Sequence, residues 1–100
     1  MRKIEKLALA AWNAEKAFRL DNTQIQVNRE HVFYLLHGHP IAVKKLGATT
    51  FEISACGWLT DTTKSRLNSL PGVSISQKDF RWYLNSQPWN GETIEIEASK

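Results

Sequence analysis

The sequence has a single cysteine and no long apolar run. Cys56 has no second cysteine with which to form an intramolecular disulfide, and nothing indicates an oxidising compartment. In residues 1–18, where a targeting segment would lie, charged and amide side chains interrupt the apolar positions. We therefore expect neither a signal-peptide core nor a membrane span, and the pattern favours a soluble cytoplasmic protein.

Motifs that mark common enzyme sites are also missing. The sequence contains no G-x-S-x-G, P-loop, H-E-x-x-H or dinucleotide-binding motif. His37 and His39, with His31 and Cys56 elsewhere, are residue types that bind zinc, but no second ligand pair has zinc-site spacing. We therefore predict that the protein is not an enzyme and that it has no catalytic residue, no metal site and no cofactor.

The composition is that of an ordinary folded chain. The 100 residues are 42% hydrophobic and 23% charged, which is enough apolar side chain for one core and too much for a disordered chain. A formal net charge of +3 permits attraction to nucleic acid or to an acidic protein without requiring either.

Apolar spacing predicts a helix at the start of the chain and strands after it. Ile4, Leu7, Ala11, Ala14 and Phe18 are spaced by three or four residues within 3–20, so they share one helical stripe. Four short segments with turn residues between them then favour strands. They are residues 23–28, 31–37, 41–46 and 49–56, of which the second is apolar on both faces and predicts a central strand.

A second, shorter helix is expected over residues 61–70. Thr60 is a good N-cap, Asp61 complements the helix dipole, and Pro71-Gly72 ends the helix. Three more strands are expected over residues 73–78, 80–85 and 93–98. This order predicts an α+β fold in a single domain over residues 1–100. The fold would be an antiparallel meander of about six to seven short strands with an N-terminal helix and one inserted short helix.

Two basic surfaces are candidates for nucleic-acid binding. On the second helix, Lys64 and Arg66 flank the apolar stripe, and Ser65 lies on the polar outer face. The alternative is that these long side chains only cover the edges of a buried stripe. In the hairpin near residue 79, Lys78, Arg81 and Tyr83 would form a basic aromatic face, with Phe80, Trp82 and Leu84 pointing the other way. The alternative there is ordinary cross-strand packing of aromatic residues.

Several apolar residues are hard to place inside a core of this size. Leu9, Trp12 and Leu20 lie at the edge of the helical stripe or away from it, and Trp89 lies in a proline-bearing loop before a turn. We interpret Leu9, Trp12 and Trp89 as candidate partner-binding residues. For Trp89 the alternative is a lid that closes one end of the core.

One pattern carries a resemblance over most of the chain. The segments "MRKIE", "NTQIQV", "LLHG", "GW", "TTKSRLN" and "QKDFRWYL", within Met1 to about Trp89, resemble a group of small proteins encoded by tailed bacteriophages. The resemblance implies a short phage accessory protein, made in the cytoplasm of the bacterial host, and it implies no activity, cofactor or catalytic residue. "LLHGHP" departs from the pattern, in which one histidine is expected, so the His37 and His39 pair fits local variation better than a metal site.

Three functional hypotheses follow. The first is a non-enzymatic phage accessory protein that binds and modulates a host protein of replication, transcription or defence. The second is a nucleic-acid-binding module that uses the basic helix and hairpin surface. The third is that the protein forms a homodimer through the first helix. None of the three hypotheses involves a membrane.

Overall fold

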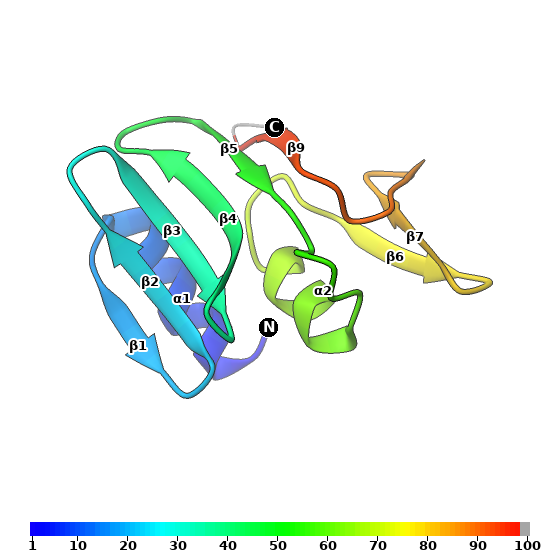
Figure 1. Cartoon of the computed structure of the whole chain (residues 1–100), viewed down its shortest axis with the longest axis horizontal. Coiled ribbons are helices and arrows are strands. Elements are labelled where there is room, and N and C mark those ends of the chain that lie inside the picture. The colour runs from blue at the N-terminus through cyan, green and yellow to red at the C-terminus, as the bar shows by residue number, and fades with distance from the viewer. Residues whose placement is uncertain (99–100) are drawn as a thin grey trace.

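Two antiparallel sheets of unequal size lie side by side, with two helices packed against the larger one (Figure 1). This computed structural model describes residues 1–98. The larger sheet, sheet A, has the order β1-β2-β3-β4-β5-β9, and the smaller, sheet B, has the order β6-β7-β8. The elements are α1 (Lys3–Ala14), β1 (Phe18–Leu20), β2 (Thr23–Val27), β3 (His31–Leu36), β4 (His39–Lys45), β5 (Thr50–Ile53), α2 (Asp61–Asn68), β6 (Ile75–Lys78), β7 (Arg81–Leu84), β8 (Gln87–Pro88) and β9 (Ile94–Glu97).

The predicted α+β class, with its N-terminal helix and inserted short helix, is confirmed. Strands β2 to β5 form the expected meander, and β1, which was predicted as helix, pairs at its edge. The chain then leaves sheet A to build sheet B and returns to place β9 beside β5. The return depends on Gly72, whose φ is +81° and where a Cβ atom would lie 2.7 Å from the carbonyl oxygen of Glu97. Only glycine fits both the left-handed conformation and this close approach.

Helix α1 is shorter than predicted and turns a different face to the core. It ends at Ala14 because Glu15 takes a left-handed conformation, and residues 18–20 pair with β2 instead. The predicted stripe is wrong, since Glu5, Ala8 and Trp12 are buried while Leu7 is 41% exposed. The buried carboxylate of Glu5, which pairs with Arg66, rotates the helix away from the face that apolar spacing indicates.

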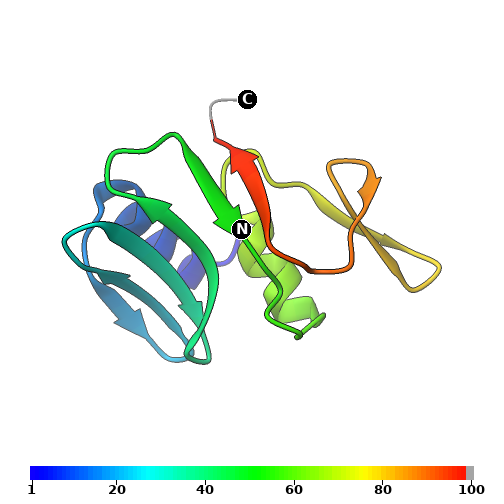
Figure 2. The same ribbon diagram turned by 45° about the horizontal axis from the view of Figure 1, so that its top comes forward.

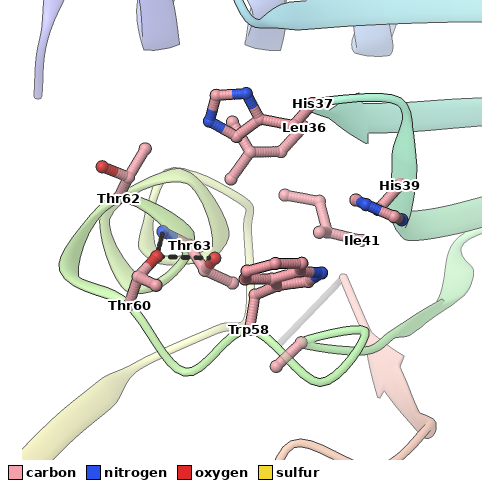
Figure 3. A pocket seen from close by; sticks show the side chains of 9 residues that line it. Leu36, His37, His39, Ile41, Trp58, Thr60, Thr62 and Thr63 are labelled. Atoms are coloured by element: carbon pink, nitrogen blue, oxygen red, sulfur yellow. Dashed lines mark hydrogen bonds between the residues drawn. The ribbon is translucent and has the colours of Figure 1, made fainter.

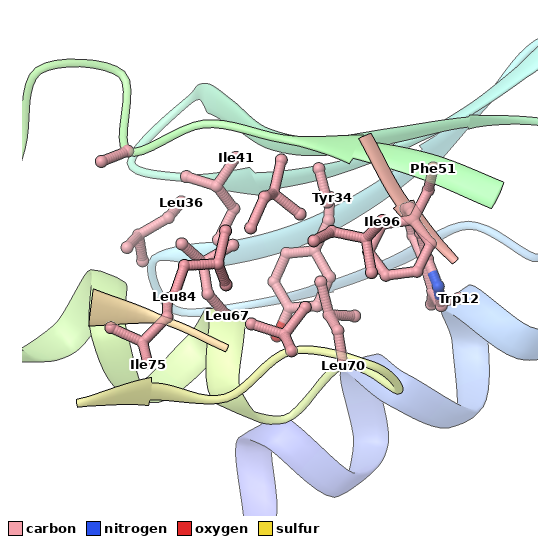
Figure 4. Packing of buried hydrophobic residues seen from close by; sticks show 14 of the residues in the cluster. Trp12, Tyr34, Leu36, Ile41, Phe51, Leu67, Leu70, Ile75, Leu84 and Ile96 are labelled. Atoms are coloured by element: carbon pink, nitrogen blue, oxygen red, sulfur yellow. The ribbon is translucent and has the colours of Figure 1, made fainter. Parts of the chain in front are cut away.

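The core lies between one face of sheet A and a layer formed by α1, α2 and the base of β6 and β7 (Figure 4). Trp12 packs its ring at 80° to that of Phe51, with 5.6 Å between ring centroids. Leu67 and Leu70 fill the α2 side, as the sequence predicts, and Ile96 of β9 completes the layer. Burial of these side chains is the main source of stability, at about 25 cal/mol per Å² of apolar area.

Sheet B projects from this core as an arm, which both views show extending away from sheet A (Figure 2). Its base is attached through side-chain amides. The Asn68 amide donates to the carbonyl oxygen of Ile75 at 3.0 Å and accepts from the Ile75 N–H at 2.6 Å, as a neighbouring strand would. Asn85 likewise accepts from the Ser74 N–H and donates to the Gly72 carbonyl. The base of the arm is thus held in a defined position relative to α2.

Candidate functional site

The middle of helix α2 belongs to a buried polar network rather than to a surface. The Arg66 guanidinium is buried and donates to Glu5 Oε2 at 2.7 Å and to Thr23 Oγ1 at 3.1 Å. Ser65 donates its hydroxyl to the same Glu5 oxygen at 2.5 Å, and Arg66 also reaches Asn22 Oδ1 at 3.5 Å. This Glu5–Arg66 network joins α1, the start of β2 and α2.

The network sets the ionisation of Glu5. Burial by itself raises the pKa of this carboxyl, but the opposing effects are larger. Hydrogen bonds from the Ser65 hydroxyl, the Arg2 N–H and the Arg66 guanidinium, with the positive charge of Arg66, hold the pKa of Glu5 below its ordinary value of 4.5. The Glu5 carboxyl is therefore ionised at neutral pH.

These contacts correct the nucleic-acid surface predicted on α2. Arg66 does not flank the stripe at the surface, because its guanidinium is neutralised inside the protein, and Ser65 has its hydroxyl turned inward. Lys64 is partly covered: its Nζ donates to Gln77 Oε1 at 3.0 Å, lies 3.6 Å from Asp61 Oδ1 and sits over the Trp82 ring. Helix α2 thus offers a phosphate group little free positive charge.

Two of the three predicted partner-binding residues are buried. Trp12 is 1% exposed inside the core, so the prediction of an exposed Trp12 is wrong. Trp89 is 7% exposed, donates its indole N–H to the Glu92 carbonyl at 2.9 Å and lies beside Trp82, so it closes this end of the core. Leu9 is half-buried against the core cluster.

The tip of the arm carries Phe80, the most exposed large apolar side chain within residues 1–98. The sequence predicted that Phe80 points inward with Trp82 and Leu84. Phe80 is 96% exposed among residues 1–98. It forms the β6–β7 turn with Asp79, and both residues have positive φ, of 66° and 53°. The turn at Asp79 was expected, but the inward orientation of Phe80 is wrong. Trp82 and Leu84 do point inward, and Arg81 is exposed, as predicted.

Between the arm and the loop before α2 lies a groove of about 570 Å³, which we call the arm groove. Its walls include Leu59, Phe80, Arg81 and Pro88, and its floor includes Trp82 and Trp89. Leu59 is 50% exposed and its neighbour Trp58 is 56% exposed. Trp58, Leu59 and Phe80 were not among the predicted site residues, and the sequence signal for Trp58 was its place in the "GW" segment of the resemblance.

Trp58 borders a second pocket, of about 390 Å³, between the β3–β4 turn and the start of α2 (Figure 3). Its floor is apolar, from Leu36 and Ile41, and its rim carries His37 and His39. The His39 and Trp58 rings lie 5.9 Å apart, tilted by 35°. No group of three or more side chains able to hold a metal ion occurs within residues 1–98. The two histidines therefore line a largely apolar hollow.

The fold and these surfaces define a small α+β protein with a projecting, apolar-tipped arm. The chain belongs to the Kyanoviridae Gp96 protein family, whose model matches residues 1–97, and it is therefore a phage protein, as the resemblance implied. No curated protein and no solved structure matches the chain. Within residues 1–98 neither helix is long and apolar enough to cross a membrane.

Three of the segments that carry the phage resemblance meet in the Glu5–Arg66 network. Glu5 lies in "MRKIE", Asn22 and Thr23 begin "NTQIQV", and Ser65 and Arg66 lie in "TTKSRLN". These segments are far apart in the sequence, and the network gives them a shared structural role. Within residues 1–98, the segments "LLHG", "GW" and "QKDFRWYL" contribute no side chain to this network.

Proposed function

We propose that this phage protein is a non-enzymatic accessory protein that binds a host protein in the bacterial cytoplasm, with the arm as its contact. The single observation that carries the proposal is Phe80, a large apolar side chain that is 96% exposed at the apex of a hairpin. Leu59, which is 50% exposed, adds apolar surface to the arm groove. Aromatic residues that project in this way are typical anchors of protein interfaces.

Folding alone does not account for Phe80. A left-handed conformation is unfavourable for a bulky residue by roughly 1 kcal/mol, and glycine or asparagine is the usual choice in such a turn. The ring also gains no burial energy in the free protein, because it makes no core contact. A partner surface that covers Phe80 would supply the burial that the free protein lacks.

Affinity capture from a host lysate tests the proposal. The immobilised protein should retain a host protein with and without nuclease treatment, and Phe80→Ser should reduce that retention at least about tenfold, as expected for an interface anchor. Leu20→Ser is the matched control, because Leu20 is 47% exposed on the edge strand of sheet A and should be neutral. Retention that nuclease abolishes would point instead to the predicted nucleic-acid-binding module, and no retention would contradict the proposal.

A further inference from the structure

We infer that the partner presents carboxylates to the outer face of sheet B, which makes the arm a contact for an acidic, partly apolar protein surface. The inference rests on the proposed function and specifies the chemistry of the partner. The outer face consists of Ser76, Lys78, Arg81 and Tyr83, with Phe80 at its end.

The strand register places the two cations together. Lys78 is the cross-strand partner of Arg81, and Ser76 is the partner of Tyr83, so all four side chains lie on the face opposite the buried Trp82 and Leu84. Lys78 and Arg81 are exposed, and Tyr83 is half-buried. Within residues 1–98, neither cation forms an ion pair.

This arrangement is unfavourable in the free protein. Like charges directly opposite on neighbouring strands repel each other and weaken the hairpin. Asp79 lies between them in the turn but forms no ion pair with either cation. Carboxylates of a partner would relieve the repulsion, and Phe80, which precedes Arg81 in the turn, would enter an apolar site that those carboxylates surround.

The charges favour a protein over a nucleic acid as the occupant. Binding to a phosphate backbone draws on several cations at once. Of the cations predicted for that role, Arg66 is neutralised by Glu5 and Lys64 is engaged by Asp61 and Gln77. Lys78 and Arg81 remain, and two exposed cations are fewer than a contact with a phosphate backbone usually draws on. Paired cations around an exposed aromatic ring match an acidic protein surface better.

Fluorescence anisotropy with defined probes tests the inference on the full chain. The probes are a labelled peptide of alternating glutamate and leucine, the same peptide with glutamine for glutamate, and an oligothymidylate single strand. We expect the glutamate peptide to bind at least about tenfold more tightly than the glutamine peptide at low salt, and the difference to shrink as salt screens the charges. The Lys78→Glu/Arg81→Glu variant should lose this preference, and Lys78→Ala/Arg81→Ala should weaken it.

A second charge reversal separates a local contact from the effect of net charge. Lys16→Glu/Arg19→Glu changes the net charge equally at two exposed positions on another part of the molecule and should keep the preference. The inference is overturned by no preference for glutamate, by an equal loss in both reversed variants, or by tighter binding of the oligothymidylate. Circular dichroism would verify that each variant is folded.

The lysate experiment keeps this inference distinct from the proposed function. If Lys78→Glu/Arg81→Glu retains the host protein as well as the natural chain does, the acidic-partner inference fails and the proposed function stands. If no host protein is retained at all, the proposed function fails whatever the peptides show.

Discussion

Phe80 combines two unfavourable features in one residue: a left-handed backbone and a ring that is almost fully exposed. The sequence allowed a turn to be predicted at Asp79, because aspartate accepts turn conformations readily. It did not reveal that Phe80 is part of that turn, since a phenylalanine with positive φ is rare and two-residue alternation places it with Trp82. The departure from the usual turn residues is what makes the position informative.

Replacing Phe80 with glycine should stabilise the free protein while weakening its binding. The substitution removes the left-handed strain, and we expect a gain of about 0.5–1 kcal/mol in the free energy of unfolding. Urea denaturation followed by tryptophan fluorescence would measure the gain, and lysate capture would measure the lost binding. A variant that is less stable than the natural chain would show that the Phe80 ring contributes to folding.

Trp89 should behave in the opposite way. Its ring closes the core beside Trp82 and its N–H has a partner in the Glu92 carbonyl, so Trp89→Ala should reduce the free energy of unfolding by about 3–5 kcal/mol. The same urea titration tests this. If the variant loses partner capture, unfolding explains the loss. A Trp89→Ala protein as stable as the natural chain would contradict the core role of Trp89.

At the scale of the elements, the Glu5–Arg66 network decides how α1 and α2 pack. Cap and turn residues predicted the position of α2 correctly: Thr60 accepts from the Thr63 N–H at 3.2 Å. The face of α1 could not be predicted in the same way, because spacing rules place glutamate in water. The residue that makes burial of Glu5 tolerable is Arg66, which no local pattern connects with it.

Arg66→Ala should therefore be among the most damaging single substitutions. It leaves the Glu5 carboxylate buried without its partner, and we expect a loss of about 3–5 kcal/mol, close to the whole stability of a small domain. Replacing both residues with methionine should recover much of the loss, because no unpaired charge then remains. Arg81→Ala, an exposed cation, serves as the control and should change stability by less than about 0.5 kcal/mol.

The depressed pKa of Glu5 also gives stability a defined pH dependence. Because the pKa is lower in the folded state than in the unfolded state, the carboxylate contributes stability above the ordinary value of 4.5. That contribution is lost as the pH falls from 4.5 through the folded pKa, since the unfolded chain takes up the proton first. Urea midpoints measured across this range should fall more steeply for the natural chain than for Glu5→Gln. If the urea midpoints of the two proteins fall in parallel with pH, Glu5 is not the source of the pH dependence.

At the scale of the whole molecule, two sheets replace the single meander that the sequence suggested. Local turns predict which strands are neighbours within β2 to β5, and those pairs are found. The pairing of β9 with β5 spans the inserted α2 and sheet B, and it depends on close packing at Gly72 that no spacing rule contains. That sheet B separates from sheet A as an arm could not be predicted either, because spacing rules do not say which strands far apart in the sequence pair.

Hydrogen exchange should reveal this division. Tyr34 in β3 lies between paired strands and inside the core, so its amide hydrogen should exchange only through global unfolding. Along the arm, protection should fall from Leu84, which is buried at the base, towards Asp79 at the exposed tip. Uniform protection along the hairpin would show that the arm is as rigid as sheet A.

The distance between Glu5 and Arg66 along the chain also bears on synthesis. The two residues are separated by 61 positions, so α1 leaves the ribosome long before its counter-charge does. Docking of α1 in that interval would bury a lone carboxylate, which is strongly unfavourable. We therefore expect the helix to dock only after Arg66 has left the exit tunnel, whereas β1 to β4 can pair before then. The order of translation, and not only the final contacts, would then set when the core of this protein closes.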